Sequence, residues 1–120
     1  MKVLESKKEL KQKYKEMKTP MGIIMIKNTV NGKVFIDSNS DTKSIINRHR
    51  FQLKAGSHRI KELQQDWKEY GEAVFTFEVL EELSYDEKEE NKDYGEELEI
   101  MKLIWIDMLS KNDPAMIYKK

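Results

Sequence analysis

The sequence predicts one α/β (α+β) domain in which a small three-stranded antiparallel sheet is flanked by helices. Two short apolar runs, at 22–27 and 33–37, are joined by Asn31-Gly32, which is a strong signal for a hairpin turn. A third run at 73–80 is rich in β-branched and aromatic residues that alternate with polar ones. Amphipathic helical patterns lie before, between and after these runs, and a sheet of three strands needs helices to cover it.

Length and composition restrict the class of protein. A chain of 120 residues is the size of one domain and can bury a single core. The absence of cysteine excludes a disulfide scaffold and thiolate zinc sites, and it suits a reducing compartment. The N-terminus lacks the apolar stretch of a secretory signal, and no run approaches membrane-spanning length. We therefore expect a cytoplasmic protein without a membrane partner.

The first half of the chain contributes one helix before the hairpin and one after it. Between residues 4 and 17, apolar residues recur at helical spacing among lysines, and these are Leu4, Leu10, Tyr14 and Met17. The pattern predicts an amphipathic helix with a basic outer face, which ends at Thr19-Pro20 because proline disfavours helix in the residue before it. After the hairpin, Asp41 is suited to cap a helix that runs to about Lys54, and Gly56 ends it.

Two further helices are expected in the second half. Ser57 can cap the first of them and Gly71 ends it, and its apolar face is formed by Ile60, Leu63, Trp67 and Tyr70. Residues 84–97 are acidic and polar, which predicts a loop or the solvated start of a helix. The last amphipathic helix carries Leu98, Met101, Ile104, Trp105, Met108 and Leu109. Asn112-Asp113-Pro114 breaks this helix, and we expect a loose tail after it.

The predicted order of elements is therefore α-β-β-α-α-β-α, without an internal repeat. We divide the chain into an N-terminal basic amphipathic helix at 1–19, the α/β domain at 20–110, and a C-terminal tail at 111–120.

The zero net charge conceals an asymmetry along the chain. Residues 1–70 hold 16 Lys and Arg against 8 Asp and Glu, and residues 71–120 hold 6 against 14. A basic half can face phosphates, although two solvated helical faces of opposite sign would give the same numbers. Six basic side chains fall within fourteen residues and form the candidate phosphate-facing surface: Arg48, His49, Arg50, Lys54, Arg59 and Lys61.

Several blocks of the sequence resemble the catalytic module of the GIY-YIG endonucleases, of the phage intron homing type. Gly22-Ile23-Ile24 and Phe35-Ile36-Asp37 correspond to the two strand motifs that name the family, with Asp37 in place of a glycine. Four more blocks are similar to such enzymes: KNTVNGKVF at 27–35, RH at 48–49, Gly-x-His at 56–58 and YG at 70–71. The resemblance covers about half of the chain and implies a GIY-YIG-like fold.

The resemblance also implies where catalytic groups would stand. Active members use two tyrosines, an arginine, a histidine and a glutamate that holds one divalent metal, Mg²⁺ or Mn²⁺. These groups correspond here to Ile24, Phe35, Ile45, His58 and Lys102. Only His58 keeps the family's residue type. Because oriented charges supply most of the catalysis in such sites, we expect a catalytically inactive protein that needs no cofactor.

Each substituted position has more than one interpretation. The three apolar residues can fill a cleft that catalysis no longer needs, and His58 can be a packing residue at the start of a helix. Lys102 can be an ordinary helix lysine, or its ammonium can stand where the metal would be and compensate Glu99. Asp37 and Glu99 are the two carboxylates that could form a relocated metal pair.

Three functions remain open on the sequence. The first is a GIY-YIG nuclease-like module that no longer cleaves and binds nucleic acid, expected to be DNA, without sequence specificity. The second is an active Mg²⁺- or Mn²⁺-dependent endonuclease with an altered site. The third is a protein-interaction module, which could form a homo-oligomer through the basic N-terminal helix and the acidic segment 81–99.

Overall fold

The computed structural model of the chain describes residues 19–85 and 93–118. The expected helix at 4–17 lies outside this range. The elements, in chain order, are β1 (Met21–Asn28), β2 (Val34–Asn39), α2 (Thr42–Ala55), α3 (Lys61–Tyr70), a 3₁₀ turn (Glu72–Val74), β3 (Phe75–Leu83), α4 (Gly95–Asn112) and a second 3₁₀ turn (Pro114–Met116). The predicted α+β class and the order of the described elements are confirmed.

The three strands form one antiparallel sheet in the order β2-β1-β3. The β1–β2 hairpin turns at Asn31-Gly32 as predicted, and Gly32 takes a positive φ of 77° that glycine adopts without strain. In the hairpin register Ile26 faces Phe35 and Ile24 faces Asp37. This register places the two strand motifs end against end, with Ile24 opposite Asp37.

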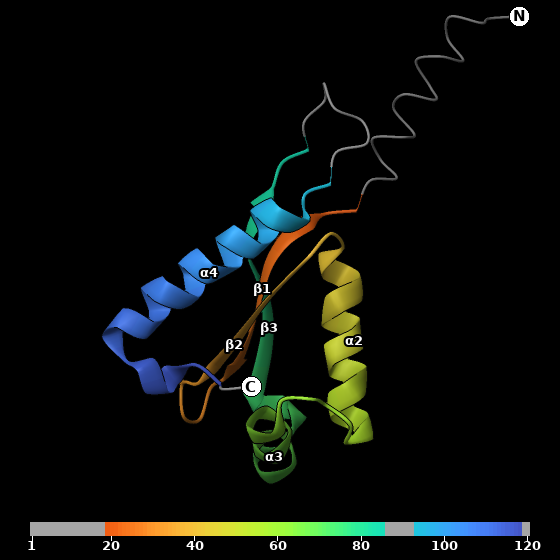
Figure 1. The fold of residues 1–120 in the computed structure, drawn as a ribbon. Helices are drawn as coiled ribbons and strands as arrows, with labels where there is room; N and C mark the ends of the chain where they lie inside the picture. Colours follow the sequence, from red (N-terminus) through yellow and green to blue (C-terminus); the bar gives the residue numbers. More distant parts are fainter. Residues whose placement is uncertain (1–18, 86–92, 119–120) are drawn as a thin grey trace, which may run out of the picture.

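Helices cover both faces of the sheet (Figure 1). The helix α4 crosses one face, while α2 lies on the other face with α3 at its lower end. The central strand β1 is therefore apolar on both sides, and its side chains alternate between two cores. Ile24 and Ile26 join the core beneath α2 and α3, and Ile23 joins the core beneath α4. Among the described residues, no helix is both long enough and apolar enough to span a membrane.

The ends of α2 follow the prediction, but the start of α3 does not. The side chain of Asp41 accepts a hydrogen bond from the Ser44 backbone N–H at 3.1 Å, and Gly56 ends α2 in a left-handed conformation. Ser57 does not cap α3, because the helix begins four residues later, at Lys61. The backbone N–H of Ile60 instead donates to a ring nitrogen of His58.

The helix α4 differs from the prediction in which of its faces is buried. Four of the six expected residues pack against the sheet or the adjoining core: Leu98, Met101, Trp105 and Leu109. Ile104 and Met108 are on the opposite face and are half exposed. Together with two neighbours they form what we call the outer stripe, which consists of Ile100, Leu103, Ile104 and Met108.

The expectation of a loose tail after Asn112 is wrong as far as Tyr118. Ile117 forms a parallel bridge with Val34, and Tyr118 is buried. The Tyr118 hydroxyl donates to the Asp66 carboxylate at 2.7 Å and accepts from the Asn28 side-chain amide at 3.2 Å. These partners come from α3 and β1, so the C-terminal segment closes one end of the core.

Candidate functional site

Three of the five positions at which the resemblance implies catalytic groups lie in one apolar cluster. Ile24, Phe35 and Ile45 come from β1, β2 and α2, and their exposed fractions are 0%, 4% and 5%. Leu53 and Leu63 belong to the same cluster. At these three positions the space between the hairpin and α2 is therefore filled by packed side chains that cannot exchange protons or carry charge.

The two histidines of the chain lie beside this cluster in a continuous line of hydrogen bonds. Nδ1 of His49 is 2.8 Å from Nε2 of His58, and Nε2 of His49 is 2.8 Å from Oδ2 of Asp37. At the far end, Nδ1 of His58 accepts the backbone N–H of Ile60 at 3.1 Å. We call Asp37, His49 and His58 the buried relay. The ring of Phe35 packs edge-on against both imidazoles.

The hydrogen-bond partners fix the direction of the relay. Because the backbone N–H of Ile60 can only donate, Nδ1 of His58 is an acceptor and the ring proton of the neutral imidazole is on Nε2. That proton is donated to Nδ1 of His49, whose own proton on Nε2 is donated to Asp37. Every nitrogen of both rings is therefore in use.

Burial and charge shift the acidities within the relay. Burial is the main cause that lowers the pKa of His58 to about 4, and the neighbouring His49 and Arg59 act in the same direction. For Asp37 burial alone would raise the pKa. The hydrogen bonds from His49 and the Ser38 backbone, with the positive charge of Lys102, outweigh burial and lower the pKa. The geometry thus favours a neutral His58 and an ionised Asp37.

The prediction that His49 faces a nucleic acid is wrong. Its exposed fraction is 3%, and both of its nitrogens bond inside the protein. Ile45, His49 and Leu53 are spaced by four residues and share the buried face of α2. That spacing was available in the sequence and could have identified His49 as an interior residue.

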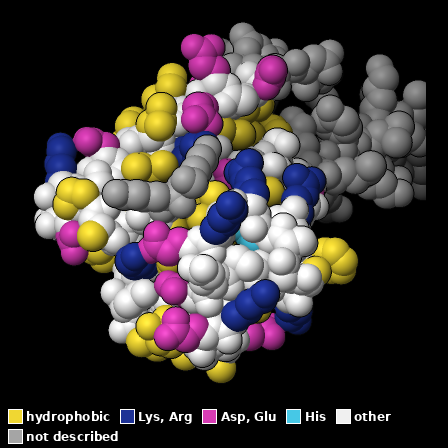
Figure 2. Space-filling model, turned by 60° about the horizontal axis from the view of Figure 1, so that its bottom comes forward, with side chains coloured by type: hydrophobic (Ala, Val, Ile, Leu, Met, Phe, Trp, Pro, Cys, Tyr) yellow, Lys and Arg dark blue, Asp and Glu magenta, His cyan; other side chains and the backbone are white. Residues whose placement is uncertain are grey.

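The other basic residues of the predicted surface lie around the solvent side of α2 and the start of α3. Arg48, Lys54, Arg59 and Lys61 are exposed, whereas Arg50 is half-buried with its guanidinium 4.5 Å from the centre of the Phe77 ring. Figure 2 shows Lys and Arg side chains gathered around the point where a histidine just reaches the surface.

One aromatic side chain stands among these cations. Phe51 is 73% exposed, and it lies three residues from both Arg48 and Lys54 on the solvent side of α2. The whole of α2 holds four Lys and Arg and no Asp or Glu. We call the exposed residues Lys43, Arg48, Phe51 and Lys54 the cationic face.

A solved structure with the same fold decides the family. The catalytic domain of the homing endonuclease I-TevI superimposes with a TM-score of 0.65 at 31% sequence identity, over 82% of this chain and 95% of that domain. The chain belongs to the GIY-YIG family. A point mutant of the same domain gives a TM-score of 0.66 at 30% identity, over 84% of this chain and 93% of that one.

The sequence of one curated GIY-YIG relative is also similar. Intron-associated endonuclease 1 of Enterobacteria phage T4 is 38% identical over 65 residues, which is 54% of this chain and 26% of the relative. The matched region thus spans about a quarter of the length of that relative. No protein-family model matches the chain.

Lys102, which the resemblance places at the position of the family's metal-binding glutamate, lies on the sheet-facing half of α4. Its side chain is 16% exposed and its ammonium is 3.0 Å from the Glu99 carboxylate. Its charge also lowers the pKa of Asp37, as described above. Both carboxylates that the sequence offered as a relocated metal pair therefore interact with Lys102. Within residues 19–85 and 93–118, no three His, Asp or Glu side chains converge as metal ligands.

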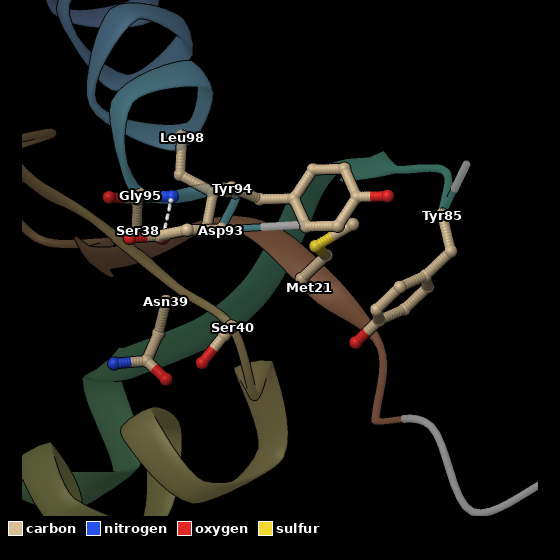
Figure 3. A pocket seen from close by; sticks show the side chains of 9 residues that line it. All are labelled: Met21, Ser38, Asn39, Ser40, Tyr85, Asp93, Tyr94, Gly95 and Leu98. Atoms are coloured by element: carbon tan, nitrogen blue, oxygen red, sulfur yellow. Dashed lines mark hydrogen bonds between the residues drawn. The ribbon is translucent and has the colours of Figure 1, made fainter. Parts of the chain in front are cut away.

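A cavity of about 420 Å³ lies elsewhere on this GIY-YIG domain, where β2 ends and α4 begins (Figure 3). Its lining is mixed and consists of Met21, Ser38, Asn39, Ser40, Tyr85, Asp93, Tyr94, Gly95 and Leu98. Asp93 is the only ionisable side chain of this lining other than the tyrosines, and its carboxylate accepts the Gly95 backbone N–H at 2.8 Å. The described residues of this lining therefore include no Lys or Arg to neutralise a phosphate, and none of the predicted site residues is among them.

Proposed function

We propose that this chain is a GIY-YIG nuclease-like domain that does not cleave nucleic acid and instead binds it, DNA in particular, without sequence specificity. The observation that carries the loss of cleavage is the closed apolar cluster of Ile24, Phe35 and Ile45. A metal-assisted hydrolysis needs groups that activate water and neutralise the developing charge, and this cluster supplies neither.

The buried relay does not replace those groups. A general base must reach the proton that it removes, either directly or through one water. Both histidines are almost completely buried, and each ring nitrogen already has a partner inside the protein. The relay is better explained as a structural link between β2, α2 and the loop before α3.

Binding is supported by the cationic face and by the exposed Arg59 and Lys61. Lys and Arg side chains that neutralise phosphates give affinity without sequence preference. The exposed ring of Phe51 adds a surface on which a base can stack. The relatives named above are endonucleases, and nucleic acid is the ligand that their names imply.

The salt dependence of binding tests this proposal. We expect a fluorescent DNA duplex to bind at low salt, with an affinity that falls steeply as salt rises. Lys54→Ser should weaken binding and reduce the slope of log K against log salt by about 1, because one phosphate contact is lost. Lys111→Ser is the matched control, since both lysines are exposed and each lies 3.4 Å from a carboxylate. Both variants are measured at nanomolar protein concentration. Under these conditions Lys111→Ser should leave the slope of log K against log salt unchanged. Absence of binding at low salt would remove the proposal.

Cleavage is tested with supercoiled plasmid and Mg²⁺ or Mn²⁺. We expect the plasmid to remain intact at protein concentrations that bind it. Nicking that disappears in His58→Ala, while a folded spectrum is retained, would instead support an active endonuclease with an altered site.

A further inference from the structure

The helix α4 is apolar on two opposite faces, and only one of them is covered by the described residues. The outer stripe consists of Ile100, Leu103, Ile104 and Met108, whose exposed fractions are 50%, 55%, 53% and 50%. Their spacing places them on one side of the helix, opposite the residues that pack against the sheet. A helix that is apolar all round is normally buried on every side, and a contiguous exposed apolar patch marks an interaction site.

The outer stripe is separate from the cationic face. The sheet lies between α4 and α2, so the two surfaces point in different directions (Figure 1). A ligand of the cationic face would therefore leave the outer stripe uncovered. The stripe also offers no basic side chain at its centre, which makes it a poor surface for phosphates.

The charges at the two ends of the stripe are opposite. Glu96 and Glu97 lie in the first turn of α4, and Lys111 lies in the last turn. The ammonium of Lys111 is 3.4 Å from the Asp107 carboxylate of the same helix, and 72% of the Lys111 side chain remains exposed to a further partner. If a second α4 packs antiparallel to the first, the acidic end of each helix meets the Lys111 of the other. The two helix dipoles are also antiparallel in this arrangement, which is favourable.

We propose that the outer stripe is the interface of a homodimer in which two α4 helices pair antiparallel about a two-fold axis close to Ile104. A two-fold interface must be complementary to itself. About this axis Ile104 faces its own copy, Ile100 faces Met108, and Glu97 approaches Lys111. The inference does not depend on the proposed nucleic-acid binding.

The size of the stripe sets the expected strength of the dimer. Specific interfaces usually bury roughly 800 Å² per partner. Four half-exposed side chains from each copy supply less area than this, so the contact is at the small end of the range. We therefore expect a concentration-dependent dimer with a dissociation constant in the micromolar range.

Cysteine cross-linking can test the geometry directly, because the chain contains no cysteine. In the full-length protein, Ile104→Cys should form a disulfide-linked dimer under mild oxidation, since this position faces its own copy. Ile100→Cys and Met108→Cys should each form little dimer alone, and an equimolar mixture of the two should form the mixed dimer. Val30→Cys, at a 56% exposed position in the hairpin turn, is the control for random collision.

Sedimentation equilibrium gives a second measurement. The protein should dimerise as its concentration rises. Leu103→Glu should be monomeric, with the unfolding midpoint that the parent protein has at concentrations where it is a monomer. Lys111→Glu should weaken the dimer at least several-fold, and adding Glu97→Lys to Lys111→Glu should restore it. Val79→Glu, at an exposed position on β3, is the matched control and should dimerise normally.

Three results would overturn the proposal. The first is a monomer at every concentration without cross-linking at Ile104→Cys. The second is efficient self-linking of Ile100→Cys, which would indicate a parallel pair. The third is a cross-link within one chain between Ile104→Cys and Tyr14→Cys, which would identify the N-terminal segment as the occupant of the stripe.

Discussion

Gly22→Ala is expected to destabilise the protein by about 3 kcal/mol or more, because the added methyl group cannot be accommodated. A Cβ built on Gly22 lies 2.0 Å from the carbonyl oxygen of Glu81 and 2.9 Å from the Cα of Glu82. Both contacts are with backbone atoms of the neighbouring strand β3, so no side-chain rotation relieves them. The close approach of β3 is sufficient to require a glycine at position 22.

The register of the sheet explains this close approach. Ile23 pairs with Glu81 and Ile24 pairs with Val79, so β3 carries one extra residue at Leu80. Such a bulge bends the strand locally, and it lies next to Gly22.

Urea unfolding of Gly22→Ala and of a control measures the cost. Gly95→Ala is the control, because the nearest atom to its Cβ belongs to the side chain of Asp93, which can move away. We expect the control to change the free energy of unfolding by no more than about 1 kcal/mol, in the stabilising direction that alanine favours in a helix. A loss below about 1 kcal/mol for Gly22→Ala would contradict the strand geometry.

The second large effect is a loss of stability in mild acid. The pKa of His58 is about 4 in the folded protein, against 6.5 for an ordinary histidine. Between these values the unfolded chain binds a proton that the folded protein does not, so stability rises with pH across this window. The contribution is fully present above pH 6.5 and falls by roughly 3 kcal/mol as the pH decreases to 4. The lowered pKa of Asp37 continues the loss at still lower pH.

Unfolding midpoints at pH 7 and pH 4.5 measure this loss. His58→Asn is the informative variant, because its side-chain oxygen can still accept the Ile60 N–H but the residue does not titrate. We expect the variant to be less stable at pH 7 and to lose markedly less stability than the parent protein between the two pH values. Equal losses in both proteins would show that other groups cause the acid sensitivity.

Much of the fold follows from local signals in the sequence. The Asn31-Gly32 turn, the Asp41 cap and the Gly56 end depend on residues close together in the chain, and all three are confirmed. The family was also identified correctly from short blocks, since these blocks lie on the hairpin, on α2 and just after it, and at the end of α3, whose positions the fold fixes.

The features that sequence analysis missed depend on contacts between distant segments. The buried relay joins β2, α2 and the loop before α3, and nothing local to His49 shows that Asp37 is its partner. The docking of Tyr118 likewise depends on Asn28 and Asp66, which are distant in the chain. For α4, an apolar pattern on two faces was interpreted as one wide face, since periodicity shows which side chains share a face but not which face is covered.

The position of the sheet between α4 and α2 has a consequence for how the protein would act on long DNA. A dimer joined through α4 would carry its two cationic faces on opposite outer sides of the particle. One duplex could not easily contact both faces, so each dimer would be bivalent and would tether separate segments. Once one face is bound, the second is held at high local concentration near other DNA. The protein would then compact or bridge DNA, and weak binding at each face would be sufficient.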